Sequence, residues 1–134
     1  MNKIKVAIVE NDEDERFFMV QSFGGAGTFE LIGEFGNGDQ LFDWLANAPQ
    51  VLPQLIVTDL NMPGKNGYDV ICEVAAHYPQ IQVIATSTSF IPATREKCQR
   101  MGAREFLLKP DVFIDYDSFV SRVYELVKDE LVKD

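Results

Sequence analysis

The chain has 134 residues, the size of one ordinary domain, so we expect a single domain over residues 1–134 with no separate output domain. Its composition, 46% hydrophobic and 25% charged, is typical of a globular protein, and no apolar run approaches the roughly 20 residues of a membrane span. A net charge of -9 argues against direct nucleic-acid binding, because phosphate contacts require clustered Lys and Arg, and favours proteins or small ions as partners.

The start of the chain, MNKIKVAIVEND, has acidic residues directly after a short apolar run. It lacks the long apolar core and the small-residue cleavage site of a signal peptide, so we expect a cytoplasmic protein. Cysteines stay reduced in that compartment. Cys72 and Cys98 both fall in helical patterns, and we expect them to be core thiols rather than a disulfide.

Apolar runs alternate with segments of helical spacing along the whole chain. The short apolar runs predict strands at residues 4–9, 29–34, 55–59, 81–85 and 105–108. Helical spacing predicts a helix that carries Phe17, Phe18 and Phe23, and further helices at 39–48, 68–77, 92–102 and, after a loop at 111–117, 119–131. Parallel neighbours need helical crossovers that pack on both faces, so this alternation predicts a doubly wound α/β sheet whose strand order stays open.

The acids that follow the first strand have a structural explanation. Asp12 and Glu15 have the spacing of a capping box at the start of the first helix, where carboxylates also interact favourably with the helix dipole. We therefore expect part of the acidic run from Glu10 to Glu15 to do no more than cap this helix.

Polar side chains follow four of the predicted strands at the point where each strand ends. In chain order they are Glu10 with Asn11, Asp59, Ser87 with Thr88, and Lys109. The carboxyl ends of parallel strands meet at one edge of a sheet, which is where open α/β sheets keep their sites. We therefore expect these side chains to converge.

Together these residue types fit the chemistry of a phosphorylated aspartate. Oxygen donors beside a carboxylate make a site for Mg²⁺, which keeps several waters and accepts phosphate oxygens as ligands. A lysine and a hydroxyl can neutralise a phosphoryl group, and a carboxylate can itself accept that group. We therefore predict that Asp59 is a phosphoryl acceptor, with the alternative that it only caps the turn after it.

The same segments resemble a known family, the receiver domains of two-component response regulators, over nearly the whole chain. VAIVEN is similar to the first strand of that family with its acidic pair, and TDLNMPGKNG is similar to the phosphoacceptor segment D-x-x-M-P-x-x-x-G. VIATST resembles the fourth strand with its switch Thr or Ser, and GAREFLLKP resembles the fifth strand with its Lys-Pro. Four motifs in register make the resemblance specific.

The resemblance implies an acceptor and a metal site. Asp59 would be the phosphoacceptor. It would hold Mg²⁺ together with Glu10, Asn11 and the backbone carbonyl of Asn61. The resemblance also implies a flavodoxin-like sheet of five parallel strands in the order 2-1-3-4-5, with five helices.

The resemblance further implies a switch. Ser87 would bond a phosphoryl oxygen, and Lys109 would pair with the phosphoryl group. Phe106 would be the aromatic residue that turns inward as Ser87 moves. This motion would alter the face made by the fourth helix, the fifth strand and the fifth helix, which a downstream protein would bind.

Three features depart from the family pattern. Asn11 stands where most receivers place a second acid, and the missing charge, worth on the order of a kcal/mol or more, leads us to expect weak Mg²⁺ affinity. Thr88 replaces the commoner Ala or Gly beside the switch hydroxyl, which would narrow access for a phosphodonor or an attacking water. The segment DVFIDYDS after Lys109 and Pro110 is longer than the usual link to the last helix, which would reshape that rim.

The preferred function is a stand-alone receiver. It would take a phosphoryl group from a histidine kinase or phosphotransfer protein and signal through a protein partner, catalysing only its own phosphotransfer and dephosphorylation. The alternative is a pseudo-receiver, a protein-binding module independent of phosphorylation, and Asn11 motivates it. A haloacid-dehalogenase-like phosphatase also uses a strand-end Asp but normally has a second Asp two residues on, where this chain has Asn61.

The fourth helix is the part of the predicted output face with the fewest apolar residues. It carries Arg95, Lys97 and Arg100, so we expect it to be the least firmly anchored helix and the one most easily shifted. An acidic or amphipathic partner would fit such a face.

Overall fold

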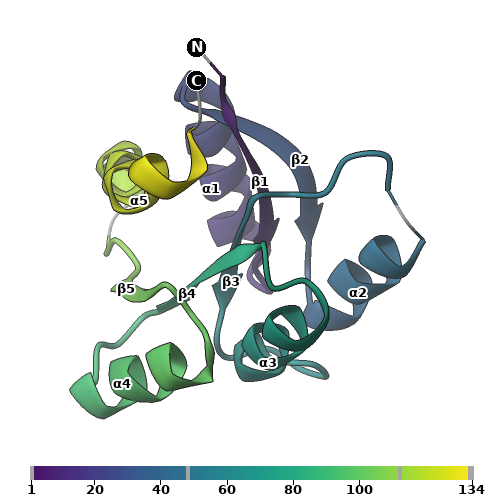
Figure 1. Ribbon diagram of the computed structural model, residues 1–134. Helices are drawn as coiled ribbons and strands as arrows, with labels where there is room; N and C mark the ends of the chain where they lie inside the picture. The colour runs from purple at the N-terminus through teal and green to yellow at the C-terminus, as the bar shows by residue number, and fades with distance from the viewer. Residues whose placement is uncertain (1, 48, 112, 133–134) are drawn as a thin grey trace.

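The computed structural model describes residues 2–47, 49–111 and 113–132, and it alternates strands with helices throughout (Figure 1). In chain order the elements are β1 (Ile4–Val9), α1 (Glu13–Gly25), β2 (Phe29–Phe35), α2 (Gly38–Ala46), β3 (Leu55–Asp59), α3 (Gly67–His77), β4 (Gln82–Ser87), α4 (Pro92–Met101), β5 (Glu105–Leu108), the 3-10 turn η1 (Phe113–Asp115) and α5 (Tyr116–Leu131). All strand pairs are parallel, and the order is β2-β1-β3-β4-β5. The predicted fold class and the implied order are confirmed.

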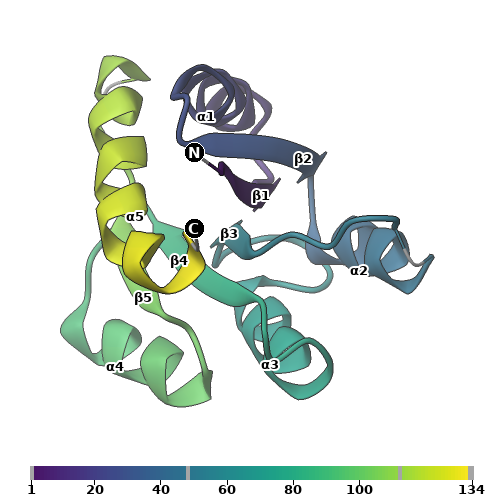
Figure 2. The ribbon, with the colours of Figure 1, turned by 45° about the horizontal axis from the view of Figure 1, so that its top comes forward.

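The helices cover the sheet in two layers (Figure 2). On one face α1 and α5 pack against the sheet through a core that includes Phe23 and Val123. On the other face α2, α3 and α4 supply residues such as Leu41 and Val74. Because side chains alternate along β3, Val57 enters the first core and Ile56 the second, which explains why this strand is apolar on both faces.

Several element boundaries differ from the sequence prediction by one to three residues, and two of these differences bear on the rim of the sheet. β4 runs to Ser87 rather than ending at residue 85, because Thr86 and Ser87 pair with Leu107 and Leu108 of β5. α5 begins at Tyr116, inside the predicted loop at 111–117, and η1 precedes it. The link that was expected to be long is therefore largely helical. The last residue of the predicted 39–48 helix, residue 48, lies outside the described residues.

One core expectation is wrong. Cys98 is buried, but Cys72 is exposed, and both are free thiols. The buried side of α3 consists of Gly67, Val70, Ile71 and Val74, and the residue after Ile71 points about 100° away from that side. Among the described residues, no helix combines the length and the apolar composition needed to cross a membrane.

Candidate functional site

The strand register brings four strand ends to one rim of the sheet. The Leu60 amide donates to the Thr86 carbonyl at 3.0 Å, and the Lys109 amide donates to the Ser87 carbonyl at 2.8 Å, which ties β3 to β4 and β4 to β5 just past their last residues. On the other side, the Glu10 amide donates to the Phe35 carbonyl at 2.9 Å. The polar residues that follow the strands are therefore neighbours in space.

Three ionisable side chains are buried together at this rim. Glu10 is fully buried, while Asp59 and Lys109 are 8% and 6% exposed. The Lys109 Nζ lies 2.6 Å from Glu10 Oε1 and 3.4 Å from Asp59 Oδ1. One ammonium thus faces two carboxylates, and the three side chains keep one uncompensated negative charge.

Burial and pairing set the charges of this cluster. Burial raises the pKa of the Glu10 carboxyl, and the contact with Lys109 and the Asp12 amide only partly opposes this rise. Burial pulls the pKa of Lys109 down, but Glu10 and Asp59 outweigh it and leave that pKa raised. Lys109 is therefore a firmly protonated cation beside Asp59.

The loop after Asp59 folds tightly back on the strand. The Gly67 amide donates to the Leu60 carbonyl at 3.0 Å, and a Cβ on Gly67 would lie 2.4 Å from the Asp59 carbonyl oxygen. Only glycine permits this approach, which gives a physical reason for the last Gly of the TDLNMPGKNG segment. Asn61 is exposed at the start of the same loop, two residues after Asp59.

The donor set at the rim fits a hard divalent cation. Glu10 Oε2 accepts from the Asp12 amide at 3.0 Å, and the buried Oε1 lies 2.6 Å from the Lys109 Nζ and has no other donor among the described residues. Within the described ranges, no group of three or more His, Cys, Asp or Glu side chains could hold a metal ion. The protein can therefore offer two carboxylates and carbonyl oxygens, a small set that suits Mg²⁺ with its retained waters.

The structure does not pack the Asn11 side chain into this cluster. Asn11 is exposed and lines a polar hollow of about 320 Å³ with residues of α1, β2, α2 and the turn that leads into α2, among them Arg16 and Asn37. Arg16 Nη1 donates to the Glu10 carbonyl at 2.9 Å and so fixes the backbone from which Asn11 projects. Asn11 thus lies at the rim, on the solvent side of Glu10.

Ser87 and Phe106 are buried on adjacent strands but are not paired: Ser87 lies opposite Leu108, and Phe106 lies opposite Ala85. Ser87 is the last residue of β4, and its Oγ accepts from the Ser89 amide at 3.4 Å. In the part of the chain that the structure describes, no hydrogen bond joins Ser87 to Asp59. Phe106 lies in the core beneath α4, with its ring centroid 5.5 Å from that of Phe90. Thr88, by contrast, is exposed.

Sequence reasoning missed one polar contact near the site. Asp12 Oδ1 accepts from the Glu15 amide at 2.9 Å, as helix capping requires. The carboxylate of Glu15 does not close the predicted capping box but accepts from the hydroxyl of Tyr116. A pairing across 101 residues leaves no spacing signal in the sequence.

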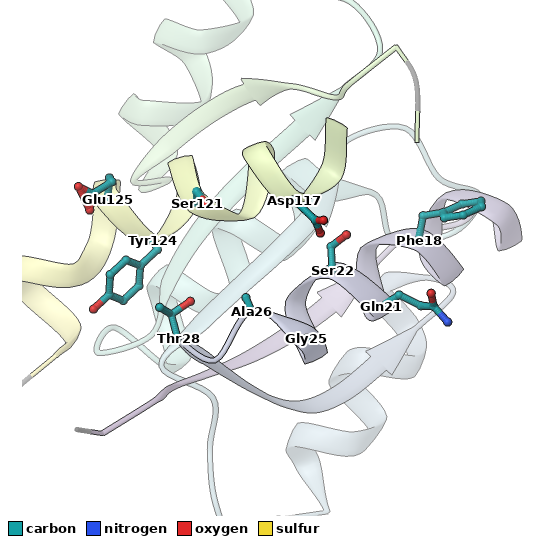
Figure 3. A pocket seen from close by; sticks show the side chains of 10 residues that line it. All are labelled: Phe18, Gln21, Ser22, Gly25, Ala26, Thr28, Asp117, Ser121, Tyr124 and Glu125. Carbon is teal, nitrogen blue, oxygen red and sulfur yellow. The ribbon is translucent and has the colours of Figure 1, made fainter. Parts of the chain in front are cut away.

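A larger hollow lies away from the rim. It has a volume of about 690 Å³ and runs between α1 and α5, lined by residues such as Ser22, Asp117 and Tyr124 (Figure 3). None of the strand-end residues lines it, so it is not part of the acidic cluster.

Comparison with known proteins places this geometry in a family. Residues 6–117 match the response regulator receiver domain family. The chain is 39% identical over 72 residues to the two-component response regulator ARR8 of Arabidopsis thaliana, covering 49% of this chain and 32% of that protein. It is 28% identical over 122 residues to the DNA-binding transcriptional regulator NtrC of Azospirillum brasilense, covering 91% of this chain and 24% of that protein.

Solved structures agree on the fold. The phosphorylated cyanobacterial phytochrome response regulator RcpA superposes with a TM-score of 0.80 at 20% identity, over 92% of this chain and 93% of that one. The chain belongs to the response regulator receiver domain family. It spans only about a quarter to a third of the two curated relatives named above, so their complete activities do not transfer to it.

Proposed function

We propose that this receiver accepts a phosphoryl group on Asp59 from a histidine kinase or a histidine phosphotransfer protein, in a Mg²⁺-dependent reaction. The observation that carries the proposal is the Lys109 ammonium held between two buried carboxylates, 2.6 Å from Glu10 and 3.4 Å from Asp59, at the rim of a receiver sheet. A cap of the following turn would need no buried lysine and no second carboxylate.

The proposed reaction is a group transfer between two side chains. An Asp59 oxygen forms the new O–P bond as the P–N bond of the donor phosphohistidine breaks, and the imidazole leaves with the electron pair. Lys109 pairs with an oxygen of the incoming group, and the Ser87 hydroxyl donates to another. Bound Mg²⁺ would offset the negative charge that gathers between that group and the carboxylates. Glu10, Asp59, the Asn61 carbonyl and the Asn11 amide would hold it.

The proposed output follows from the position of Ser87. If its hydroxyl is drawn toward the phosphoryl group, the end of β4 moves against β5, which carries Phe106, and Phe106 contacts Phe90 in the link to α4. Apolar residues are exposed along this side of the molecule: Phe90, Ile91 and Leu108. A downstream protein would bind the face made by α4, β5 and α5.

The pseudo-receiver remains the second candidate because of one residue. Asn11 supplies no charge at the metal site, so the site could have lost phosphorylation and kept a protein-binding role.

We also propose that the receiver does not turn over phosphate esters. A phosphatase assay on small phosphate esters tests this statement, and steady turnover would contradict it.

The stand-alone and cytoplasmic character of the receiver belongs to the same proposal. The protein isolated from its own cells should then have the 15.1 kDa mass of the 134-residue chain and fractionate with the cytoplasm. A longer protein with an attached output domain would contradict the first expectation.

The experiment that tests the proposal is an intact-mass measurement. The protein is mixed with a small phosphodonor with and without Mg²⁺, and we expect one added phosphoryl group only with Mg²⁺. Asp59→Asn should abolish the adduct, whereas Asp43→Asn, an identical change at an exposed position of α2, should not. The absence of an adduct with the small donor and with kinase or phosphotransfer donors would favour the pseudo-receiver.

A further inference from the structure

Tyr116 carries a hydroxyl into a fully buried position. It is the first residue of α5, has no exposed surface, and packs its ring on that of Phe119 with centroids 5.7 Å apart. Phenylalanine would make the same apolar contacts without burying a polar group. A buried hydroxyl is costly unless it is hydrogen-bonded, so the role of this residue must lie in what its hydroxyl binds.

The hydroxyl donates to the carboxylate of Glu15 in the first turn of α1. This bond joins the first turns of two helices that lie on the same face of the sheet (Figure 2). Farther along, the outer surface between α1 and α5 is hollowed by the groove that Ser22 and Asp117 line (Figure 3). The bond is therefore a polar tie at the end of the helix pair that borders the phosphoacceptor rim.

Glu15 acts electrostatically on Tyr116 and Lys109, as Glu10 and Asp59 at the rim also do. Burial, and after it Glu15, Glu10 and Asp59, raise the pKa of Tyr116. Glu15 also contributes, after Glu10 and Asp59, to the raised pKa of Lys109. Glu15 is thus a third carboxylate within electrostatic range of the lysine. Among the described residues, however, Lys109 pairs with Glu10 and Asp59 and not with Glu15.

We propose that Tyr116 is a positioning residue for phosphoryl transfer: its hydroxyl holds the Glu15 carboxylate against α5 and so keeps Lys109 directed at Asp59. It touches no reacting atom and acts through Glu15 and Lys109. The inference rests on the proposed role of Asp59 as phosphoacceptor. It adds a residue of α5 and one of α1 to the machinery that sets the lysine in place.

The physical reason is competition for one flexible cation. The Lys109 side chain has a long rotatable stem, and its Nζ is already closer to Glu10 than to Asp59. A Glu15 carboxylate released from Tyr116 would be free to turn toward the rim and would add a further attraction for the ammonium. Lys109 would then spend less time beside Asp59 and pair less well with the incoming phosphoryl group.

The test is a rescue experiment on the rate of phosphorylation. Tyr116→Phe should slow the reaction with a small phosphodonor about tenfold, which is the scale of one lost hydrogen bond to a charged group. Adding Glu15→Gln to Tyr116→Phe should restore the rate, because a neutral side chain does not attract Lys109.

Controls separate positioning from packing. Tyr124→Phe removes another hydroxyl from α5, at a residue that contacts Phe29 and lines the groove, and should leave the rate unchanged. Urea unfolding of every variant reports loss of fold. In a crystal structure of Tyr116→Phe, the Lys109 Nζ should lie farther from Asp59 Oδ1 than its present 3.4 Å.

The outcomes distinguish this inference from the proposed function. A normal rate in Tyr116→Phe would overturn the positioning role, and so would a double variant of Tyr116→Phe with Glu15→Gln that stays slow. Either result would leave Asp59 as the acceptor. No adduct on the wild-type chain would overturn the proposed function, and the positioning role with it.

Discussion

Lys109 balances the charges of the candidate site. Its ammonium faces two buried carboxylates, and among the described residues Glu10 Oε1 has no donor other than this ammonium. A divalent cation would satisfy the remaining negative charge. Its affinity should then depend on how many anionic groups reach it, and Asn11, at the rim of the cluster, contributes none.

We predict that Asn11→Asp tightens Mg²⁺ binding. One added unit of negative charge in a partly wet site is worth about 1 kcal/mol, or about fivefold in Kd. Calorimetric titration with Mg²⁺ measures the change. The apo protein should become slightly less stable, because the new carboxylate repels Glu10 and Asp59.

Asn37→Asp is the matched control for this prediction. Asn37 lines the same polar hollow and caps α2 by accepting from the Gln40 amide at 2.9 Å, a role that Asp can keep. It should tighten Mg²⁺ binding less than Asn11→Asp. Equal gains from both variants would mean that net charge alone matters, and no gain from Asn11→Asp would remove Asn11 from the metal site.

At the scale of the elements, α4 is held in a way that its sequence did not reveal. Its only buried residue within the described helix is Cys98, in agreement with its sparse apolar pattern. However, Arg95 donates two hydrogen bonds, of 2.7 and 2.9 Å, to the carboxylate of Glu105 in β5. Lys97 lies over the ring of Tyr68 of α3 at 4.2 Å. The sparse apolar face of α4 is confirmed, but polar contacts also fasten the helix, and its being the most easily shifted helix stays a prediction.

The contact between Arg95 and Glu105 should give stability a pH dependence. Hydrogen bonding to Arg95 is the largest reason why the pKa of Glu105 lies below its usual value of 4.5. Because this pKa is lower in the folded state, the ionised Glu105 carboxylate stabilises the fold at pH values above 4.5. This contribution to the free energy of unfolding is lost as the pH falls below 4.5. Arg95→Gln should therefore destabilise the protein most near neutral pH.

Urea unfolding of wild type and Arg95→Gln from about pH 7 to about pH 3 measures this effect. The difference between their free energies of unfolding should shrink as the pH falls below 4.5. Arg100→Gln, an identical change at an exposed position of the same helix, should show no such trend. A difference that stays constant with pH would contradict the electrostatic account of this contact.

At the scale of the whole molecule, the alternation of apolar runs and helical segments was enough to predict the layers. Strand ends could be placed on one rim because parallel strands share a direction, and the motif around Asp59 predicted the phosphoacceptor segment. Contacts between distant elements could not be predicted. The pairs Glu15 with Tyr116 and Arg95 with Glu105 depend on how helices dock, and the start of α5 depends on Tyr116 entering the core.

The proposed signal crosses the molecule from Asp59 to α4. We predict that Mg²⁺ with beryllofluoride, a phosphoryl mimic, changes amide hydrogen exchange across Ile91 to Arg104. Ser87→Ala should uncouple this change while the mimic stays bound. Ser89→Ala, which removes a hydroxyl two residues on, should leave the response intact. Exchange differences confined to the loops around Asp59 and Lys109 would show that this output face is wrong.

The central claim is that Glu10, Asp59, Ser87 and Lys109 form one phosphoryl site. The most direct test is an amide NMR spectrum recorded before and after adding Mg²⁺ and beryllofluoride. The account predicts that the largest shifts fall on the amides next to these four residues and that Asp59→Asn removes them. An unchanged spectrum, or shifts centred on the groove between α1 and α5, would contradict it.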